Sequence, residues 1–158
     1  MEKDLFHTIV TVRGLTENLL NQIPEQIVDI IPDGFNNNIR WNFGHIAVIQ
    51  EKLAFEALGE ELGLPYEFVT YFAAGTSPNN WDKSVPSLDD IHSVLTEQKS
   101  RIQSKLKGRL NEALPSTLRI NRLISLTTVA QTLQFSLFHE GMHIETIKNI
   151  QRLIKLKV

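Results

Sequence analysis

Two histidines near the end of the chain have a spacing that lets one metal ion bind both. His139 and His143 lie four residues apart within an apolar-periodic run. On an α-helix this spacing places both imidazoles on one face, one turn apart. Imidazole ligands favour a borderline divalent ion such as zinc, nickel, iron or copper over magnesium or calcium. Two ligands do not complete a site, so a third must come from another part of the chain.

A third inward-facing histidine is expected on an earlier helix. His45 lies near the start of a helix predicted over about residues 39–58, on the same apolar stripe as Trp41. A lone histidine in such a place is more often a core or capping residue than a ligand. Metal sites in helix bundles, however, are built from side chains on facing helices. We therefore predict that His45, His139 and His143 form a three-histidine site with an open coordination position.

The same motif also allows a peptidase interpretation. Residues 139–143 read His-Glu-Gly-Met-His, which matches the H-E-x-x-H pattern of zinc peptidases with Glu140 as general base. No histidine follows His143 in the sequence to act as a third ligand. Glu145 would lie about 200° around the helix from His143 and cannot join the same ion. The bundle site is therefore favoured over a peptidase.

Gly141 lies between the two histidines, inside the predicted helix. A glycine there costs about 1 kcal/mol relative to alanine. This cost predicts that another helix or a ligand approaches closely at Gly141, and a tolerated surface glycine is the alternative.

The hydrophobic pattern predicts the elements that must position these residues. Four long helices are expected over about residues 4–23, 39–58, 87–112 and 127–155. Capping residues are expected at one of Asn36, Asn37 and Asn38, at Ser87 with Asp90, and at Thr127 or Thr128. Residues 115–126 are a connector in which a short extended piece is allowed. No repeats or linkers divide the chain, so one domain over residues 1–158 is expected.

Residues 59–86 contain several prolines and glycines, with room for a short helix over 66–72. This connection is too long for a tight turn and suits a crossover along the length of a bundle. The prediction is therefore an all-α four-helix bundle, up-down-down-up, with a long crossover between helices 2 and 3. Tyr71 and Trp81 of the crossover, with Trp41, are candidates for lining a substrate pocket. Alternatively, the crossover aromatics close the open edge of the bundle.

Composition limits the classes of function. The chain has 158 residues, a net charge of −2 and 42% apolar residues, so nothing in it favours nucleic-acid or membrane binding. It has no cysteine, which excludes disulfides and thiolate ligands and requires any reacting thiol to come from outside. The N-terminus lacks the apolar segment of a signal peptide, and no run is long enough to span a membrane. A cytoplasmic location is expected.

The sequence resembles the DinB/YfiT-like family of metal-binding four-helix bundles over essentially its whole length. The similarity is carried by Trp41–Ile46, which reads Trp-Asn-Phe-Gly-His-Ile, by the long crossover, and by Phe138–His143. In that family one histidine of helix 2 and an H-x-x-x-H pair of helix 4 bind a divalent metal. By motif position these roles fall on His45, His139 and His143, with zinc or nickel as the favoured ion. The resemblance also implies homodimers and relatives that use low-molecular-weight thiols as S-transferases or isomerases.

The chain departs from the family pattern directly after the second histidine. The family often has a small residue followed by Gly-Gln-Ile, whereas residues 144–147 here read Ile-Glu-Thr-Ile. Glu145 thus replaces the glycine and Thr146 the glutamine. The helix contact or the polarity near the metal is therefore expected to differ from that of relatives.

Three hypotheses follow for the function. The leading one is a metal-dependent transferase that conjugates a low-molecular-weight thiol, bound to the metal as thiolate, to an electrophilic small molecule. In it Asn42 orients the substrate or a metal-bound water, with helix capping or solvation as the alternative. Glu140 supports a ligand or accepts a proton in this hypothesis, although helix geometry favours a solvated face for it. The second is a non-catalytic metal-binding protein that acts in a stress response or as a sensor. The third is a structural bundle with ordinary core histidines.

Overall fold

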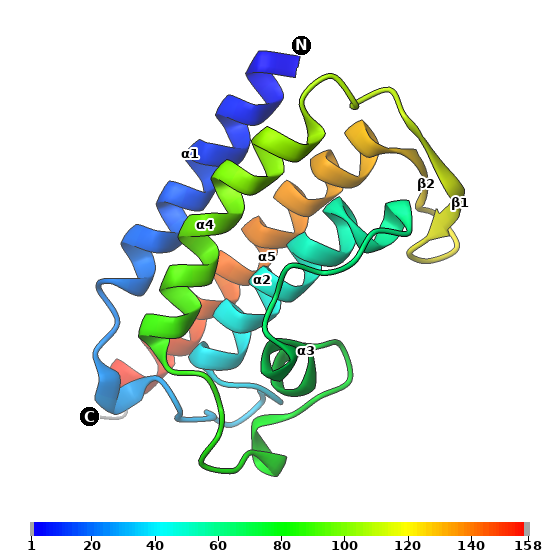
Figure 1. Ribbon diagram of the computed structural model, residues 1–158. Coiled ribbons are helices and arrows are strands. Elements are labelled where there is room, and N and C mark those ends of the chain that lie inside the picture. The colour runs from blue at the N-terminus through cyan, green and yellow to red at the C-terminus, as the bar shows by residue number, and fades with distance from the viewer. Residues whose placement is uncertain (1, 157–158) are drawn as a thin grey trace.

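The computed structural model describes residues 2–156, which form five α-helices and one small antiparallel sheet (Figure 1). The helices are α1 (Glu2–Leu20), α2 (Ile39–Ala54), α3 (Tyr66–Phe72), α4 (Leu88–Leu106) and α5 (Val129–Leu156), and the strands are β1 (Ala113–Arg119) and β2 (Ser125–Thr128). α1 packs beside α4, and α2 packs beside α5, α4 and α3. The mainly helical fold is confirmed, with a hairpin where the sequence allowed a short extended piece.

Three of the four long helices end earlier than predicted. α1 ends at Leu20 and not near residue 23. α2 ends at Ala54, and a single 3-10 turn leads to Gly59, which has a φ of 76°. α4 ends at Leu106, just before Gly108 with a φ of 79°. Gly108 adopts this left-handed conformation without strain, and so it ends α4 before the predicted residue 112.

The predicted helix caps are confirmed. Asn38 accepts a hydrogen bond from the first turn of α2 at 2.8 Å. Ser87 and Asp90 form a reciprocal capping box at the start of α4, with bonds of 3.1 and 2.9 Å. At the start of α5 the Thr128 hydroxyl accepts a bond from the Gln131 N–H at 3.4 Å. These local bonds determine where each helix begins and therefore which side chains face inward.

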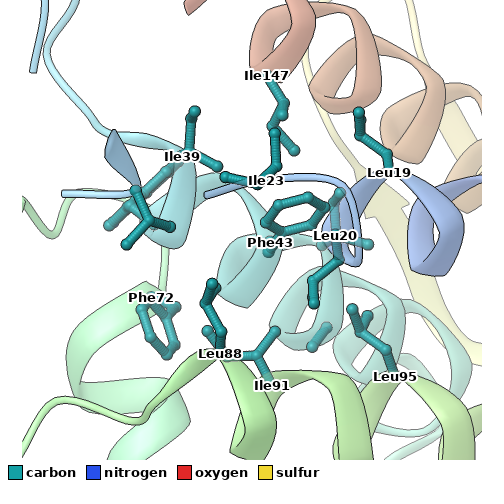
Figure 2. Close-up of a cluster of buried hydrophobic side chains, with 14 of the residues drawn as sticks. Leu19, Leu20, Ile23, Ile39, Phe43, Phe72, Leu88, Ile91, Leu95 and Ile147 are labelled. Carbon is teal, nitrogen blue, oxygen red and sulfur yellow. The ribbon is translucent and has the colours of Figure 1, made fainter. Parts of the chain in front are cut away.

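α2 is the central helix of the protein. Every residue from 39 to 48 is buried, so this helix is covered on all sides and not on one stripe only. Figure 2 shows the core around it, to which α1, α4 and α5 also contribute. Labelled members of this core are Leu19, Leu20, Ile23, Ile39, Phe43, Phe72, Leu88, Ile91, Leu95 and Ile147. His45 is buried because it belongs to this helix.

The close approach predicted at Gly141 occurs instead at Gly44. A Cβ placed on Gly44 would overlap the ring of Phe72, the last residue of α3. Gly141 lies on the exposed face of α5, and a Cβ placed there would meet no described atom within 4 Å other than those of its neighbours and of its own helix backbone. Gly141 is therefore the tolerated surface glycine, and Gly44 is the residue that lets α3 pack directly on α2.

Gly44→Ala is expected to lower the free energy of unfolding by about 1–3 kcal/mol, because Phe72 is fully buried and has to move. Urea unfolding measures the change. Gly141→Ala is the matched control in a helix and is expected to raise the stability by up to about 1 kcal/mol. Equal effects of the two substitutions would contradict this account of the packing.

Among residues 2–156, no helix combines the length and the apolar character that crossing a membrane requires.

Candidate metal centre

Three histidines from two helices come together, as the sequence predicts. His45 lies on α2, and His139 and His143 lie one turn apart on α5. Each offers one ring nitrogen, and these three atoms lie within 4.8 Å of one another. The ring centroids of His139 and His143 are 4.5 Å apart, and both rings are within 5.1 Å of the His45 ring. Three imidazoles in one place form a donor set that suits a borderline divalent ion.

The ring of His45 is held from two sides. Its Nδ1 lies 2.7 Å from the carbonyl oxygen of Phe72. Because a carbonyl can only accept, Nδ1 carries the proton and Nε2 keeps its lone pair for a metal. The Trp41 indole stacks on the imidazole at 4.3 Å and 15°, and its own N–H donates to Thr76 at 2.8 Å. Both the tautomer and the orientation of His45 are thus preset for binding.

Asn42 does the same for His143. Nδ1 of His143 lies 2.7 Å from Oδ1 of Asn42, while Nδ2 of Asn42 donates to the carbonyl of Asn38 at 2.7 Å. The second bond determines which end of the amide faces the histidine. Asn42 is 2% exposed, so neither capping nor solvation, the alternatives suggested by the sequence, describes it. Its observed contact is with a metal-ligand candidate, and its predicted role in catalysis stays a prediction.

Asn42→Ala is expected to weaken the binding of Zn²⁺ by about 10–100-fold, because partners that orient a ligating histidine contribute this much to metal affinity. Competition with a chromophoric chelator measures the dissociation constant. Asn79→Ala, in an exposed position of the crossover, is the control and should leave the affinity unchanged. An Asn42 variant with native affinity would show that this hydrogen bond is dispensable.

The three histidines are neutral at pH 7. Burial, followed by the charges of His143 and His45, lowers the pKa of His139 to about 3. Burial and the neighbouring His45 lower the pKa of His143 to about 4. Burial also lowers the pKa of His45, although its hydrogen bond to Phe72 opposes the shift. Neutral imidazole is the form that binds metals, so the site is in its ligating state at neutral pH.

The metal-free protein is expected to lose stability as the pH falls from about 6.5 to about 4. In this range the unfolded chain protonates these histidines near their ordinary pKa of 6.5, while the folded chain keeps them neutral. The unfolded state then binds more protons, so the free energy of unfolding decreases with falling pH. Urea unfolding at several pH values tests this, and His139→Gln should flatten the dependence. An unchanged slope in that variant would contradict it.

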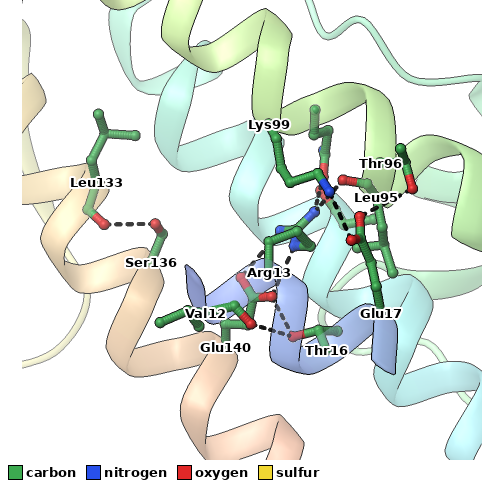
Figure 3. Close-up of polar contacts among 12 residues, drawn as sticks. Val12, Arg13, Thr16, Glu17, Leu95, Thr96, Lys99, Leu133, Ser136 and Glu140 are labelled. Carbon is green, nitrogen blue, oxygen red and sulfur yellow. Dashed lines mark hydrogen bonds and ion pairs between the residues drawn. The ribbon is translucent and has the colours of Figure 1, made fainter. Parts of the chain in front are cut away.

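Glu140, the acidic residue of the motif, faces away from solvent. Its side chain is buried, so the solvated face expected from the sequence is wrong. Its two oxygens accept bonds from Nε and Nη2 of Arg13 at 2.8 and 3.1 Å, and Thr16 donates to it at 2.5 Å (Figure 3). Arg13 in turn donates to Gln98 and to the Leu95 carbonyl, each at 3.0 Å. These contacts favour a structural role that joins α5 to α1 and α4; proton acceptance by Glu140 stays a prediction.

Two of the three aromatic candidates for a substrate pocket contact each other, because the Trp81 indole N–H donates to the Tyr71 carbonyl at 3.4 Å. Only Trp41 contacts the histidines. The Tyr71 hydroxyl donates to Asp82 at 2.6 Å, and Trp81 packs edge-on against Phe72 with centroids 5.7 Å apart. These contacts join residues of the crossover to one another. Their role in binding substrate is a prediction that no contact here tests.

A cavity of about 680 Å³ adjoins His45 and His139. It lies between α2, α5 and the β1–β2 hairpin, and its described lining does not include Trp41, Tyr71 or Trp81. The part of its lining that we call the apolar wall consists of Ile49, Leu53, Leu118, Ile120, Ile124, Phe135, Phe138 and Met142. The sequence contained a signal for this wall, since apolar residues alternate in the hairpin and flank the histidines on α5.

The fold and the site define a mainly helical protein with a three-histidine cluster that could hold a metal ion. The family model described as the DinB superfamily matches residues 8–147. The chain therefore belongs to the DinB superfamily. A search of curated proteins found no match.

Proposed function

We propose that the protein is a metal-dependent transferase that joins a low-molecular-weight thiol to an electrophilic small molecule. The observation that carries the proposal is the position of the histidine cluster, because His45 and His139 also line a cavity large enough for a small molecule. Membership of the DinB superfamily supports it, since the metal site expected from the resemblance corresponds to the three histidines that converge. Zinc or nickel is the proposed ion.

His45, His139 and His143 would hold the ion, with Phe72 and Asn42 fixing two of the rings. A bound divalent ion supplies a positive centre that lowers the pKa of a thiol and so raises the share of thiolate at neutral pH. The chain has no cysteine, so this thiol is a second substrate. The cavity holds the electrophile next to the histidines and keeps its reacting carbon close to the thiol.

In the proposed reaction the sulfur forms a bond to the electrophilic carbon. With a chlorinated substrate the carbon–chlorine bond breaks, chloride leaves and the thiol proton passes to the solvent. With an epoxide the carbon–oxygen bond breaks and the oxygen takes up a proton. Both reactions balance without an oxidant or a reductant.

The proposal includes a single domain with the four long helices in up-down-down-up order. The packing of α1 on α4 and of α2 on α5, and the course of the ribbon in Figure 1, support this order. A homodimer is also proposed. Val10, an apolar side chain that is 43% exposed on α1, supports contact with a second copy.

A conjugation assay tests the function. Common low-molecular-weight thiols are combined with chlorodinitrobenzene or styrene oxide, using metal-free, zinc-loaded and nickel-loaded protein. Turnover is expected only with metal, and His139→Ala should abolish it. If no thiol gives metal-dependent turnover, a non-catalytic metal-binding sensor or stress-response protein is favoured. The pairing of Glu140 with Arg13 supports that alternative, because both oxygens of this acidic residue already accept bonds from the guanidinium.

A further inference from the structure

The mouth of the cavity beside the histidines is apolar and exposed. Phe138, Met142 and Ile120 belong to the apolar wall and are 58%, 44% and 40% exposed. Two of them lie one turn apart on α5, and the third follows β1 in the hairpin. Single exposed apolar side chains are ordinary, but several around one cavity mark a binding site. A ligand there would cover apolar surface that now faces water.

The charges in the cavity lining cancel. Its charged side chains among the described residues are Lys52 and Glu56, which form an ion pair at 3.1 Å one turn apart. An anionic or cationic ligand would have to compete with this pair for its partner. Apart from its two histidines, the described lining of the cavity therefore offers no unpaired ionic side chain to a ligand.

The hairpin is irregular where it borders the cavity. Ala113 pairs with Thr128 and Leu118 pairs with Leu126, so β1 advances five residues while β2 advances two. The irregular stretch of β1 between these pairs includes Ser116 and Thr117, which line the cavity. Such irregularities often lie next to binding sites because they redirect side chains. The hairpin thus adds two hydroxyl groups to an otherwise mainly apolar surface.

We propose that this cavity binds an uncharged, mainly apolar small molecule and that the β1–β2 hairpin with Phe138 determines which one. The identification of this molecule with the electrophile rests on the proposed transferase function. The binding itself depends only on the apolar wall and the balanced charges, and it does not require a metal.

The test uses two fluorescent probes with the same aromatic body. N-phenylnaphthylamine is uncharged. Anilinonaphthalene sulfonate has an added sulfonate group and therefore one negative charge. The metal-free chain is expected to bind the uncharged probe saturably, and the charged probe about tenfold more weakly because its sulfonate loses water without gaining a partner. Phe138→Ala is expected to weaken binding of the uncharged probe by about tenfold through lost apolar contact. Leu15→Ala removes a side chain that is equally exposed, at 58% on α1, and should leave the affinity unchanged.

A second readout places the probe relative to the histidines. In the Co²⁺-loaded protein, a saturating amount of the uncharged probe is expected to change the visible absorption of cobalt, because His45 and His139 line the same cavity. Equal losses in the Phe138 and Leu15 variants, tighter binding of the sulfonate, or an unchanged cobalt spectrum would each overturn the inference. Probe binding without any metal-dependent conjugation would contradict the proposed function alone. Conjugation without probe binding would contradict this inference alone.

Discussion

Arg13→Ala is expected to lower the free energy of unfolding by about 3–5 kcal/mol, because it leaves the carboxylate of Glu140 buried without its partner. Arg13 and Glu140 are each 2% exposed, so water cannot replace the lost bonds without a rearrangement of the core. The substitution also removes the bonds from α1 to Gln98 and Leu95 of α4. Urea unfolding, followed by circular dichroism, measures the change in the free energy of unfolding.

Two variants show whether the unpaired charge causes this loss. Arg13→Met combined with Glu140→Leu removes both partners and should recover much of the stability, because a buried ion pair often contributes little more than an apolar pair of similar volume. Arg109→Ala, which breaks two partly exposed ion pairs, should cost at most about 1 kcal/mol. A loss as small as this for Arg13→Ala would refute the account of Glu140.

His143→Ala is expected to weaken Zn²⁺ binding by about a hundredfold to a thousandfold, since it removes one of three ligands and the share of the binding free energy that this ligand contributes. The buried Oδ1 of Asn42 then loses its bond to His143, which adds to the cost. Elemental analysis after reconstitution and chelator competition provide the metal content and the affinity.

His92→Ala is the matched control for this variant. His92 lies on α4 outside the histidine cluster and is only partly buried, so its loss should change neither metal content nor affinity. If wild type and His143→Ala carry equally negligible metal after reconstitution, the histidines are ordinary core residues and the metal site is refuted.

The three histidines could be predicted from the sequence because helical periodicity determines which residues share a face. His139 and His143 follow each other at one turn, and His45 lies on an apolar stripe. The caps that begin α2 and α4 were equally readable, since a few neighbouring residues form them. Local rules therefore predicted both the elements and the ligand candidates.

The buried polar network could not be predicted in this way. Arg13 lies between Ile9 and Thr16 on the inward face of α1, but a charged residue is expected outside unless its partner is known. That partner, Glu140, is 127 positions away in the sequence. The prediction of a solvated Glu140 failed for the same reason, because the motif itself does not show that α1 covers this face of α5.

The two glycines and the hairpin show the same limit. A mid-helix glycine signals either a close contact or none, and only the position of α3 shows that Gly44 needs the space and Gly141 does not. Apolar residues alternate along the hairpin, but the alternation is too short to distinguish a strand from an irregular connector. The cavity could not be predicted because the hairpin forms one of its sides.

The hydrogen bond from His45 to Phe72 has a thermodynamic consequence for the crossover. This bond exists only while α3 is docked on α2, so local unfolding of residues 59–86 would release the ring that an ion needs in place. If docking of α3 increases the affinity of the site for an ion, then binding of the ion stabilises the docked crossover. Thermodynamic linkage makes the two free-energy changes equal. Amide hydrogens of α3 should therefore exchange more slowly in the metal-loaded protein than in the metal-free one. Hydrogen exchange in α3 therefore reports whether the histidines bind a metal ion, although α3 contributes no side chain to the histidine cluster.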